Sequence, residues 1–425
     1  MLIPTLTLWI TGPIANVVVQ NILLVITAVA TFFLLAKLIF DEDRDLWFET
    51  GIFACLGFFA FSGTGDLNNF LTPWQTYTPA IMLGLCGLLL PRRYFVLSFA
   101  LLCLSQWCNF AMNILFAILL GFQTLGKLRR RDNVLDFSKL KLQAALLGAS
   151  SVFGYFLRKP YQNPESGGYT FMFDNPSQAL LGWTRFWSDY ATSPRASLLL
   201  IWVWPCLVTA ALVIFSRSQK LSSLYSANRN VIRSFLAGFA TLMTYSILAG
   251  ASVLAKWNGY PHRYLIPCLI IWTVCWCGLF ANLLPDLSFR RKFVASLFII
   301  PICGFRLGWP LPGAVSTSIS ARLEPDYKNV AQARCTHVVG DYYRVWDSVY
   351  YSRVVGGPEL WGIAHRSTIT YEKWNLNRFT DPRVCFWADN KDQAFGLLNY
   401  YRISGLVFSE VVGDIIVLKR GPAAL

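Results

Sequence analysis

Residues 91–131 read "PRRYFVLSFALLCLSQWCNFAMNILFAILLGFQTLGKLRRR". The apolar interior of this stretch, residues 94–122, is longer than the roughly 20 residues that one untilted membrane helix needs, yet short for two helices. Because Lys and Arg mark the cytoplasmic ends of membrane segments, the stretch predicts two short helices that turn near Gln106–Asn109, with both basic ends in the cytoplasm. The alternative is one long tilted helix, which would leave Arg92 and Arg93 on the outer side.

The composition of the whole chain is that of a membrane protein. Of its 425 residues 55% are hydrophobic, and the 14% that are charged gather in short runs between long apolar segments. We therefore predict an all-α polytopic membrane domain of about nine to ten transmembrane helices. The apolar segments run approximately over 17–40, 48–63, 77–91, 94–122, 143–157, 197–215, 235–255, 263–284 and 293–305. Most of the net charge of +14 lies between them, which indicates membrane lipids, and no nucleic acid, as partners.

The charge bias also predicts the side of the later loops. The basic runs "SRSQK" at 216–220 and "FRRK" at 289–292 are expected in the cytoplasm. The loops at 158–196 and 256–262 then face the outer side of the membrane, together with the chain after residue 305.

The sequence changes character after residue 305. Residues 1–305 form the predicted transmembrane domain, and 306–425 a small C-terminal α/β domain outside the cytoplasm, joined by a Gly, Pro and Ser-rich linker at 306–325. Its elements are predicted as a strand, turn and helix in "THVVGDYYRVWDSVYYSRV", strands in "ELWGIAHRS" and "RVCFWAD", a helix in "NKDQAFGLLNYYRI", and a hairpin in "GLVFSEVVGDIIVLKR" that turns at Gly413–Asp414.

Two cysteines stand apart from the other nine. Cys335 and Cys385 lie in the polar C-terminal third, whereas the others fall in apolar stretches without metal-ligand spacing. In an oxidising periplasm this pair could close a disulfide across the domain. Two unpaired buried thiols fit the spacing equally well, because sequence gives no distance between the two residues.

Three polar clusters share the predicted outer face. They contain Asp66, Asn68 and Asn69 in the loop 64–76, which is also predicted to be external, Tyr169 and Asp174 in the long loop 158–196, and Tyr260, His262, Arg263 and Tyr264 in "KWNGYPHRYLIP". Carboxylates and amides beside aromatic rings suit sugars, and cations beside them suit a phosphate leaving group. A plainer interpretation also exists, because Asp66 can be a turn residue and Tyr or Arg at a helix end can be an interface anchor.

The sequence contains no soluble-enzyme motif that would indicate another chemistry. It lacks a Gly-rich phosphate loop, an H-E-x-x-H pair and a nucleophile elbow. With three histidines in the chain, a His-rich metal site is not expected. The sequence indicates no cofactor, and it leaves open a requirement for a divalent metal ion.

The order of these pieces resembles the GT-C class of membrane glycosyltransferases. The similar parts are the early helix that ends in "AKLIFDEDRD", the next loop with an acidic residue, the arginine-flanked 91–131 stretch, and "HRYLIPC", which resembles the R-Y-L-x-P that opens a late membrane helix in that class. The resemblance implies transfer of a sugar from a polyprenyl-phosphate carrier to a glycan, lipid or protein acceptor, at the outer face of a bacterial inner membrane. It implies that Arg263 and Tyr264 contact the phosphate of the donor. By its location alone, Asp66 corresponds to the catalytic carboxylate of that class.

One departure from that pattern concerns the catalytic base. Members of the class carry it on a first external loop, and here no Asp or Glu precedes Asp41, so the chain is expected to lack the usual first helix and loop. If "DEDRDLW" lies outside, Asp41, Glu42 or Asp43 can replace Asp66. The alternatives to an active enzyme are a transporter or flippase of lipid-linked glycans and a catalytically inactive relative.

Overall fold

The computed structural model describes most of the chain. The described residues are 13–40, 44–61, 77–109, 111–128, 137–158, 176–192, 229–252, 256, 262–283, 312–340, 342–364, 380–388, 390–400 and 404–421. The chain divides into a unit of Ile22–Trp309 and a second unit of Pro310–Leu425 with Met1–Asn21. The boundary predicted after residue 305 lies close to this division.

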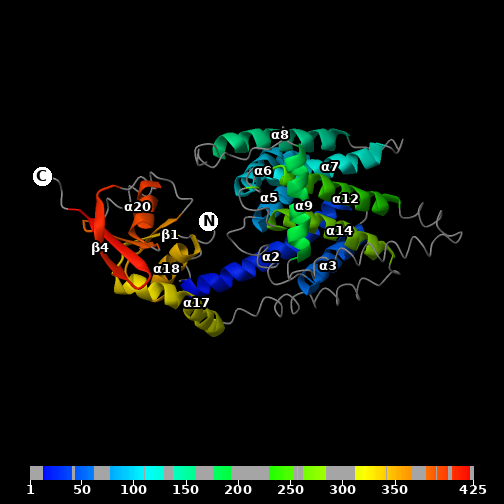
Figure 1. Cartoon of the computed structure of the whole chain (residues 1–425). Coiled ribbons are helices and arrows are strands. Elements are labelled where there is room, and N and C mark those ends of the chain that lie inside the picture. Colours follow the sequence, from blue (N-terminus) through cyan, green and yellow to red (C-terminus); the bar gives the residue numbers. More distant parts are fainter. Residues whose placement is uncertain are drawn as a thin grey trace. The chain divides into compact units, whose positions relative to one another are not determined.

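The larger unit is helical throughout its described residues (Figure 1). Its elements are α2 (Pro13–Ile39), α3 (Arg44–Phe61), α5 (Tyr77–Leu89), η1 (Arg92–Tyr94), α6 (Phe95–Cys108), α7 (Ala111–Leu128), α8 (Phe137–Arg158), α9 (Pro176–Thr192), α12 (Arg229–Gly250), η4 (His262–Leu265) and α14 (Ile266–Leu283). The predicted apolar segments that fall on described residues are all helical, and those at 197–215 and 293–305 lie outside them.

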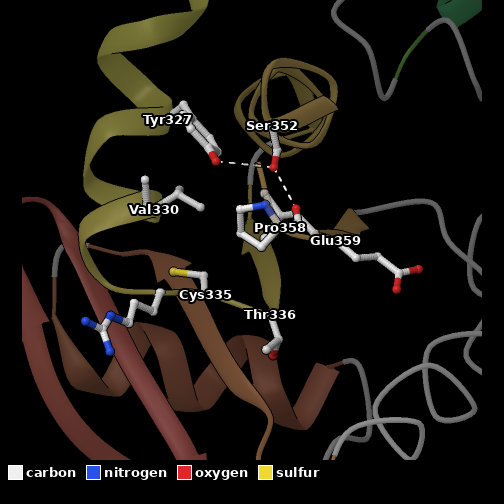
Figure 2. A pocket seen from close by; sticks show the side chains of 10 residues that line it. Tyr327, Val330, Cys335, Thr336, Ser352, Pro358 and Glu359 are labelled. Carbon is white, nitrogen blue, oxygen red and sulfur yellow. Dashed lines mark hydrogen bonds between the residues drawn. The ribbon is translucent and has the colours of Figure 1, made fainter. Parts of the chain in front are cut away.

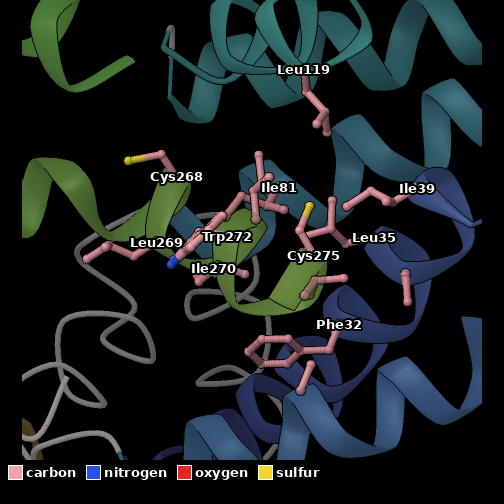
Figure 3. Close-up of a cluster of buried hydrophobic side chains, with 14 of the residues drawn as sticks. Phe32, Leu35, Ile39, Ile81, Leu119, Cys268, Leu269, Ile270, Trp272 and Cys275 are labelled. Atoms are coloured by element: carbon pink, nitrogen blue, oxygen red, sulfur yellow. The ribbon is translucent and has the colours of Figure 1, made fainter. Parts of the chain in front are cut away.

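Helix α14 lies at the centre of the helical core. Almost every described side chain on it is buried, including Trp272 and Cys275 (Figure 3). It packs against α3 and α12. Glycine permits the close approach to α12, because a Cβ at Gly238 of α12 would overlap the side chain of Cys275. A helix that is apolar all round is therefore enclosed by other helices, as its composition requires.

The 94–122 segment is broken where the sequence predicts it. Helix α6 ends at Cys108 and α7 begins at Ala111, and Asn109 between them has extended backbone angles of φ −153° and ψ 111°. The Oδ1 atom of Asn109 accepts a hydrogen bond from the Ala111 N–H at 3.1 Å, which caps the first turn of α7. The single-helix alternative is wrong. The two helices also take different neighbours, since α6 packs chiefly on α5 and α8 and α7 on α12.

Two of the described helices are long and apolar enough to cross a membrane by length and composition. They cover Lys139–Leu157 of α8 and Val231–Gly250 of α12. Shorter apolar helices within the described residues are Val25–Ile39, Leu46–Cys55, Thr78–Leu89, Ala111–Leu125 and Ile266–Leu279.

The smaller unit has a five-stranded sheet in the order β2-β1-β3-β5-β4. The strands are β1 (His337–Gly340), β2 (Trp361–Ala364), β3 (Arg383–Trp387), β4 (Leu406–Val412) and β5 (Ile415–Arg420), and the helices are α17 (Pro312–Gln332), α18 (Tyr342–Val354) and α20 (Lys391–Tyr400). β1 pairs in parallel with β2 and β3, and β5 is antiparallel to β3 and β4. All predicted elements of this domain are present, with the hairpin turn at Gly413–Asp414.

Two apolar cores cover the two faces of this sheet. Side chains of α17 and α18 pack with Val338 and Val417 on one face, and Ala394 and Leu398 of α20 pack with Val339 on the other. This arrangement follows from the alternation of strand side chains between two buried faces. The described part of the smaller unit is thus a three-layer α/β/α domain.

The predicted linker at 306–325 is wrong where the structure describes it, because α17 begins at Pro312. Proline is well tolerated in the first turn of a helix, and one more proline, Pro325, lies inside α17 on its exposed side. The helix is stabilised by burial of Leu323, Tyr327 and Val330 against α18, since this spacing places the three side chains on one face. Tertiary packing therefore outweighs the turn-forming composition of the segment.

The disulfide that the sequence left open is present. Cys335 and Cys385 are bonded, with their Cα atoms 5.9 Å apart. Cys335 lies just before β1 and Cys385 on the neighbouring strand β3. Both are almost fully buried, so the bond closes the core on the α17 side of the sheet.

Candidate functional site

Most of the predicted site residues lie outside the described residues. These are Asp41, Glu42, Asp43, Asp66, Asn68, Asn69, Tyr169, Asp174 and Tyr260. The "HRYL" sequence forms the 3-10 helix η4 directly before α14, so the motif does open a late apolar helix. Within it, the structure describes the side chain of Tyr264, and those of His262 and Arg263 lie outside the described part.

Tyr264 is held by an aromatic junction that joins η4, α9 and α12. Its ring lies 6.4 Å from that of buried Phe186 on α9, at an edge-on angle of 70°. On the same helix Trp183 donates its Nε1–H to Ser246 Oγ of α12 at 2.9 Å. Trp187 completes the junction, with its ring 6.5 Å from that of Trp183. The motif is therefore anchored to α9 by an aromatic contact, and α9 is bonded in turn to α12.

A glycine permits the close approach of α9 to α12. A Cβ at Gly250, the last residue of α12, would lie 2.7 Å from the backbone nitrogen of Trp183. A larger residue there would push α9 away and remove the contact of Phe186 with Tyr264. Residues 158–196 are predicted as a loop, but their described part contains helix α9. The signal was the apolar and aromatic spacing in "LLGWTRFW", which places Leu180, Trp183 and Trp187 on one side of a helix.

A second polar feature, the polar seam, lies between α6, α7 and α8. The amide nitrogen Nδ2 of Asn113 donates to Gln106 Oε1 at 2.8 Å and to Ser150 Oγ at 2.9 Å. Gln106 Nε2 donates in turn to the Ser151 carbonyl at 2.9 Å. Asn113 Oδ1 is buried and has no partner among the described residues. The seam spans the break between α6 and α7, and all its side chains are neutral.

The smaller unit contains a hollow of about 430 Å³ beside the disulfide (Figure 2). Its lining includes Tyr327, Val330 and Leu360, with Arg334 and Glu359 exposed. The Tyr327 hydroxyl donates to Ser352 Oγ at 3.3 Å, and Ser352 donates to the Pro358 carbonyl at 2.8 Å. An apolar wall with two opposite charges is suited to a small amphipathic ligand. The sequence carried no signal for this hollow, because its lining residues are brought together by the fold.

Two residues of α18 make contacts within the smaller unit. Arg344 forms ion pairs with Asp414 at 3.3 Å and with Asp326 at 4.0 Å. Trp346 packs against the core beneath α18. In the same domain, burial raises the pKa of Tyr350 to about 12, so its hydroxyl stays neutral at physiological pH.

No metal centre is present within the described ranges, where no three His, Cys, Asp or Glu side chains come together. No family model matches the chain, and no curated protein or solved structure matches it either.

Proposed function

We propose that the protein is a polytopic membrane glycosyltransferase of the GT-C kind. It takes a sugar from a polyprenyl-phosphate carrier and transfers it to a glycan, lipid or protein acceptor on the outer face of the bacterial inner membrane. The smaller unit lies in the periplasm.

Exposed apolar side chains support the membrane placement. On α8 the exposed fractions of Val152, Phe153 and Phe156 are 60%, 48% and 62%, and on α6 those of Leu104 and Trp107 are 50% and 46%. Large apolar side chains exposed in this number are unfavourable in water and favourable in lipid. The oxidised Cys335–Cys385 pair supports a periplasmic smaller unit, because disulfides persist in oxidising compartments.

The observation that carries the proposed function is the placement of the "HRYL" turn. It opens the buried apolar helix α14 and is fixed by Tyr264 to the amphipathic helix α9. A cation on such a turn lies at the end of an apolar helix, where a phosphate on a lipid chain would also lie. A Lys or Arg there can neutralise the phosphate as it departs.

The proposed reaction assigns separate roles to a carboxylate and a cation. An acceptor hydroxyl loses its proton to a carboxylate, for which Asp66 is the first candidate, and its oxygen bonds to the anomeric carbon. The bond from that carbon to the phosphate oxygen breaks, and the polyprenyl phosphate departs with the bonding electrons while Arg263 stabilises the added charge. The hollow beside Cys335 is large enough to hold a sugar ring of the acceptor.

The test is a transfer assay on the full chain in detergent with a radiolabelled polyprenyl-phosphate sugar and total envelope glycolipid as acceptor. Arg263→Ala is expected to lose at least about 100-fold in rate, because a charge-stabilising donor is removed from the transition state. Arg353→Ala is the matched control, since Arg353 is exposed on α18 and far in sequence from the motif. Equal transfer by the wild type and both variants would contradict the assignment of Arg263.

The polar seam favours a second candidate, a transporter or flippase of lipid-linked glycans. Transporters bind their substrates at interrupted helices, and the seam lies at the break between α6 and α7. It holds no ionisable side chain, which weakens this reading. Lipid-linked glycan that crosses reconstituted vesicles without sugar transfer would favour it, and neither activity would favour a catalytically inactive relative.

A further inference from the structure

Four cations gather at one end of the helical unit, and we call this group the basic end. Arg92 and Arg93 form the exposed turn η1, where the Arg93 guanidinium lies 4.8 Å from the centroid of the Tyr94 ring. Lys139 and Lys141 are exposed near the start of α8. Lys139 also takes part in a further contact within the chain, so the basic end does not depend on its being unpaired.

A hydrogen bond places these two pairs of cations at the same end. Gln143 Nε2 of α8 donates to the carbonyl of Leu88 in the last turn of α5, at 3.1 Å. The chain continues from Leu88 through Pro91 into η1, and Lys139 precedes Gln143 by about one helical turn. At the other end, Gln106 of α6 bonds to Ser151 of α8. Helices α6 and α8 therefore run in the same direction, and the start of α8 lies at the same end as η1 and the start of α6.

The surface next to the basic end changes from polar to apolar along α6. Tyr94, Phe95, Val96 and Leu97 follow the two arginines, with exposed fractions of 44%, 54%, 65% and 50%. A cation, then an aromatic ring with a polar tip, then aliphatic side chains is the order in which a bilayer passes from headgroup to hydrocarbon. Both the charge and this order match a phospholipid.

We propose that Arg92, Arg93, Lys139 and Lys141 form a binding site for the phosphate-bearing headgroup of an anionic phospholipid. The acyl chains of that lipid lie along Phe95, Val96 and Leu97. The inference rests on the membrane placement proposed above and not on sugar transfer. A cluster that acts only during membrane insertion, as a topology signal, would show no preference between lipids at equilibrium.

The experiment compares lipid binding by the full chain in detergent, measured by native mass spectrometry against phosphatidylglycerol and phosphatidylcholine. The wild type is expected to retain phosphatidylglycerol preferentially. The R92Q/R93Q and K139Q/K141Q variants should each bind it about 30-fold more weakly, because each basic residue near an anionic surface contributes about a factor of five. R92K/R93K keeps the charge and should keep the binding. K328Q/R353Q removes two exposed cations of the smaller unit and should change nothing.

Equal retention of both lipids, or equal losses in K328Q/R353Q and the other glutamine pairs, would overturn the proposal. Inorganic phosphate in the same buffer separates the sources, since competition at millimolar concentration would indicate a site for free phosphate instead of a lipid. Carbonate extraction of cell membranes separates this inference from the proposed function. Release of the protein by carbonate would contradict the membrane placement that both require, whereas lost transfer with intact lipid selectivity would contradict the enzyme assignment alone.

Discussion

The two units both bury an apolar core but differ in the side chains that their helices and strands expose. In the helical unit α8 buries Gln143 and Ser150 and exposes Phe153 and Phe156. In the smaller unit β1 is wholly buried, while charged residues such as Lys328 on α17 are exposed. The membrane placement proposed above would account for this difference, because the two units would then face two solvents. In lipid, apolar side chains can be exposed and polar groups need hydrogen-bond partners inside the protein. In water, charged and polar side chains are favourably exposed and apolar side chains are buried.

The largest effect is expected at the disulfide, which belongs to the smaller unit. Cys335→Ser with Cys385→Ser should lower the free energy of unfolding of that unit by about 4 kcal/mol, because the bond closes a loop over a sequence separation of 50. Urea unfolding followed by tryptophan fluorescence measures the change. Reductant should destabilise the wild type and leave the double serine variant unaffected. If reductant destabilises both equally, the loss comes from elsewhere.

A charge on an exposed apolar position should distinguish the two solvents directly. Val152→Lys on α8 is expected to cost about 3 kcal/mol of membrane insertion if that position lies in hydrocarbon. Val407→Lys on β4, where the side chain is 46% exposed, should cost less than about 0.5 kcal/mol. The amounts of each variant that resist carbonate extraction, and their thermal stability, report the two costs. Equal tolerance at both sites would refute the two-solvent interpretation.

Two asparagines give a smaller, matched comparison. Asn113→Ala removes the donor at the centre of the polar seam and should destabilise the helical unit by about 1 kcal/mol. Asn329→Ala removes an exposed bond to Asp414 Oδ1 of 2.8 Å and should cost less than about 0.5 kcal/mol. Thermal unfolding of both variants in the same detergent measures the difference. A larger loss for Asn329 would reverse the expected order.

The last effect appears only at alkaline pH. Burial raises the pKa of Tyr350 to about 12 in the folded domain, above the value of about 10 in an unfolded chain. The native state therefore favours the neutral phenol. Its contribution to stability is complete below pH 10 and is lost as the pH rises from 10 toward 12. Tyr350→Phe should flatten the fall in melting temperature across that interval, and an unchanged slope would show that Tyr350 is not responsible.

The sequence predicted the strands and helices of the smaller unit. The catalytic and binding roles that it suggested for residues of the larger unit stay predictions. Alternating apolar residues identified the strands of the smaller unit. The polar C-terminal third contains two cysteines, so a disulfide within it could only join Cys335 and Cys385. The helical break at Asn109 was also predictable, because an amide near the middle of an overlong apolar run satisfies the freed backbone groups.

The features that were missed depend on contacts between distant residues. Helix α17 forms because Leu323, Tyr327 and Val330 find a partner in α18, which composition cannot show. The junction of Tyr264 with Phe186 joins residues far apart in sequence, as does the hollow beside Cys335. Asp66 and Arg263 remain predictions, supported by the resemblance of their surroundings to the GT-C class.

The most direct test of the two-solvent account is labelling from outside with a membrane-impermeant maleimide. Lys328 on α17 and Lys141 on α8 are both exposed. The proposed membrane placement puts Lys328 in the periplasm and Lys141 in the cytoplasm, and each is replaced by cysteine for the test. In intact spheroplasts Lys328→Cys should be labelled at once and Lys141→Cys after lysis, with the unmodified chain as background. Labelling of both before lysis, or of Lys328→Cys after lysis alone, would contradict the account.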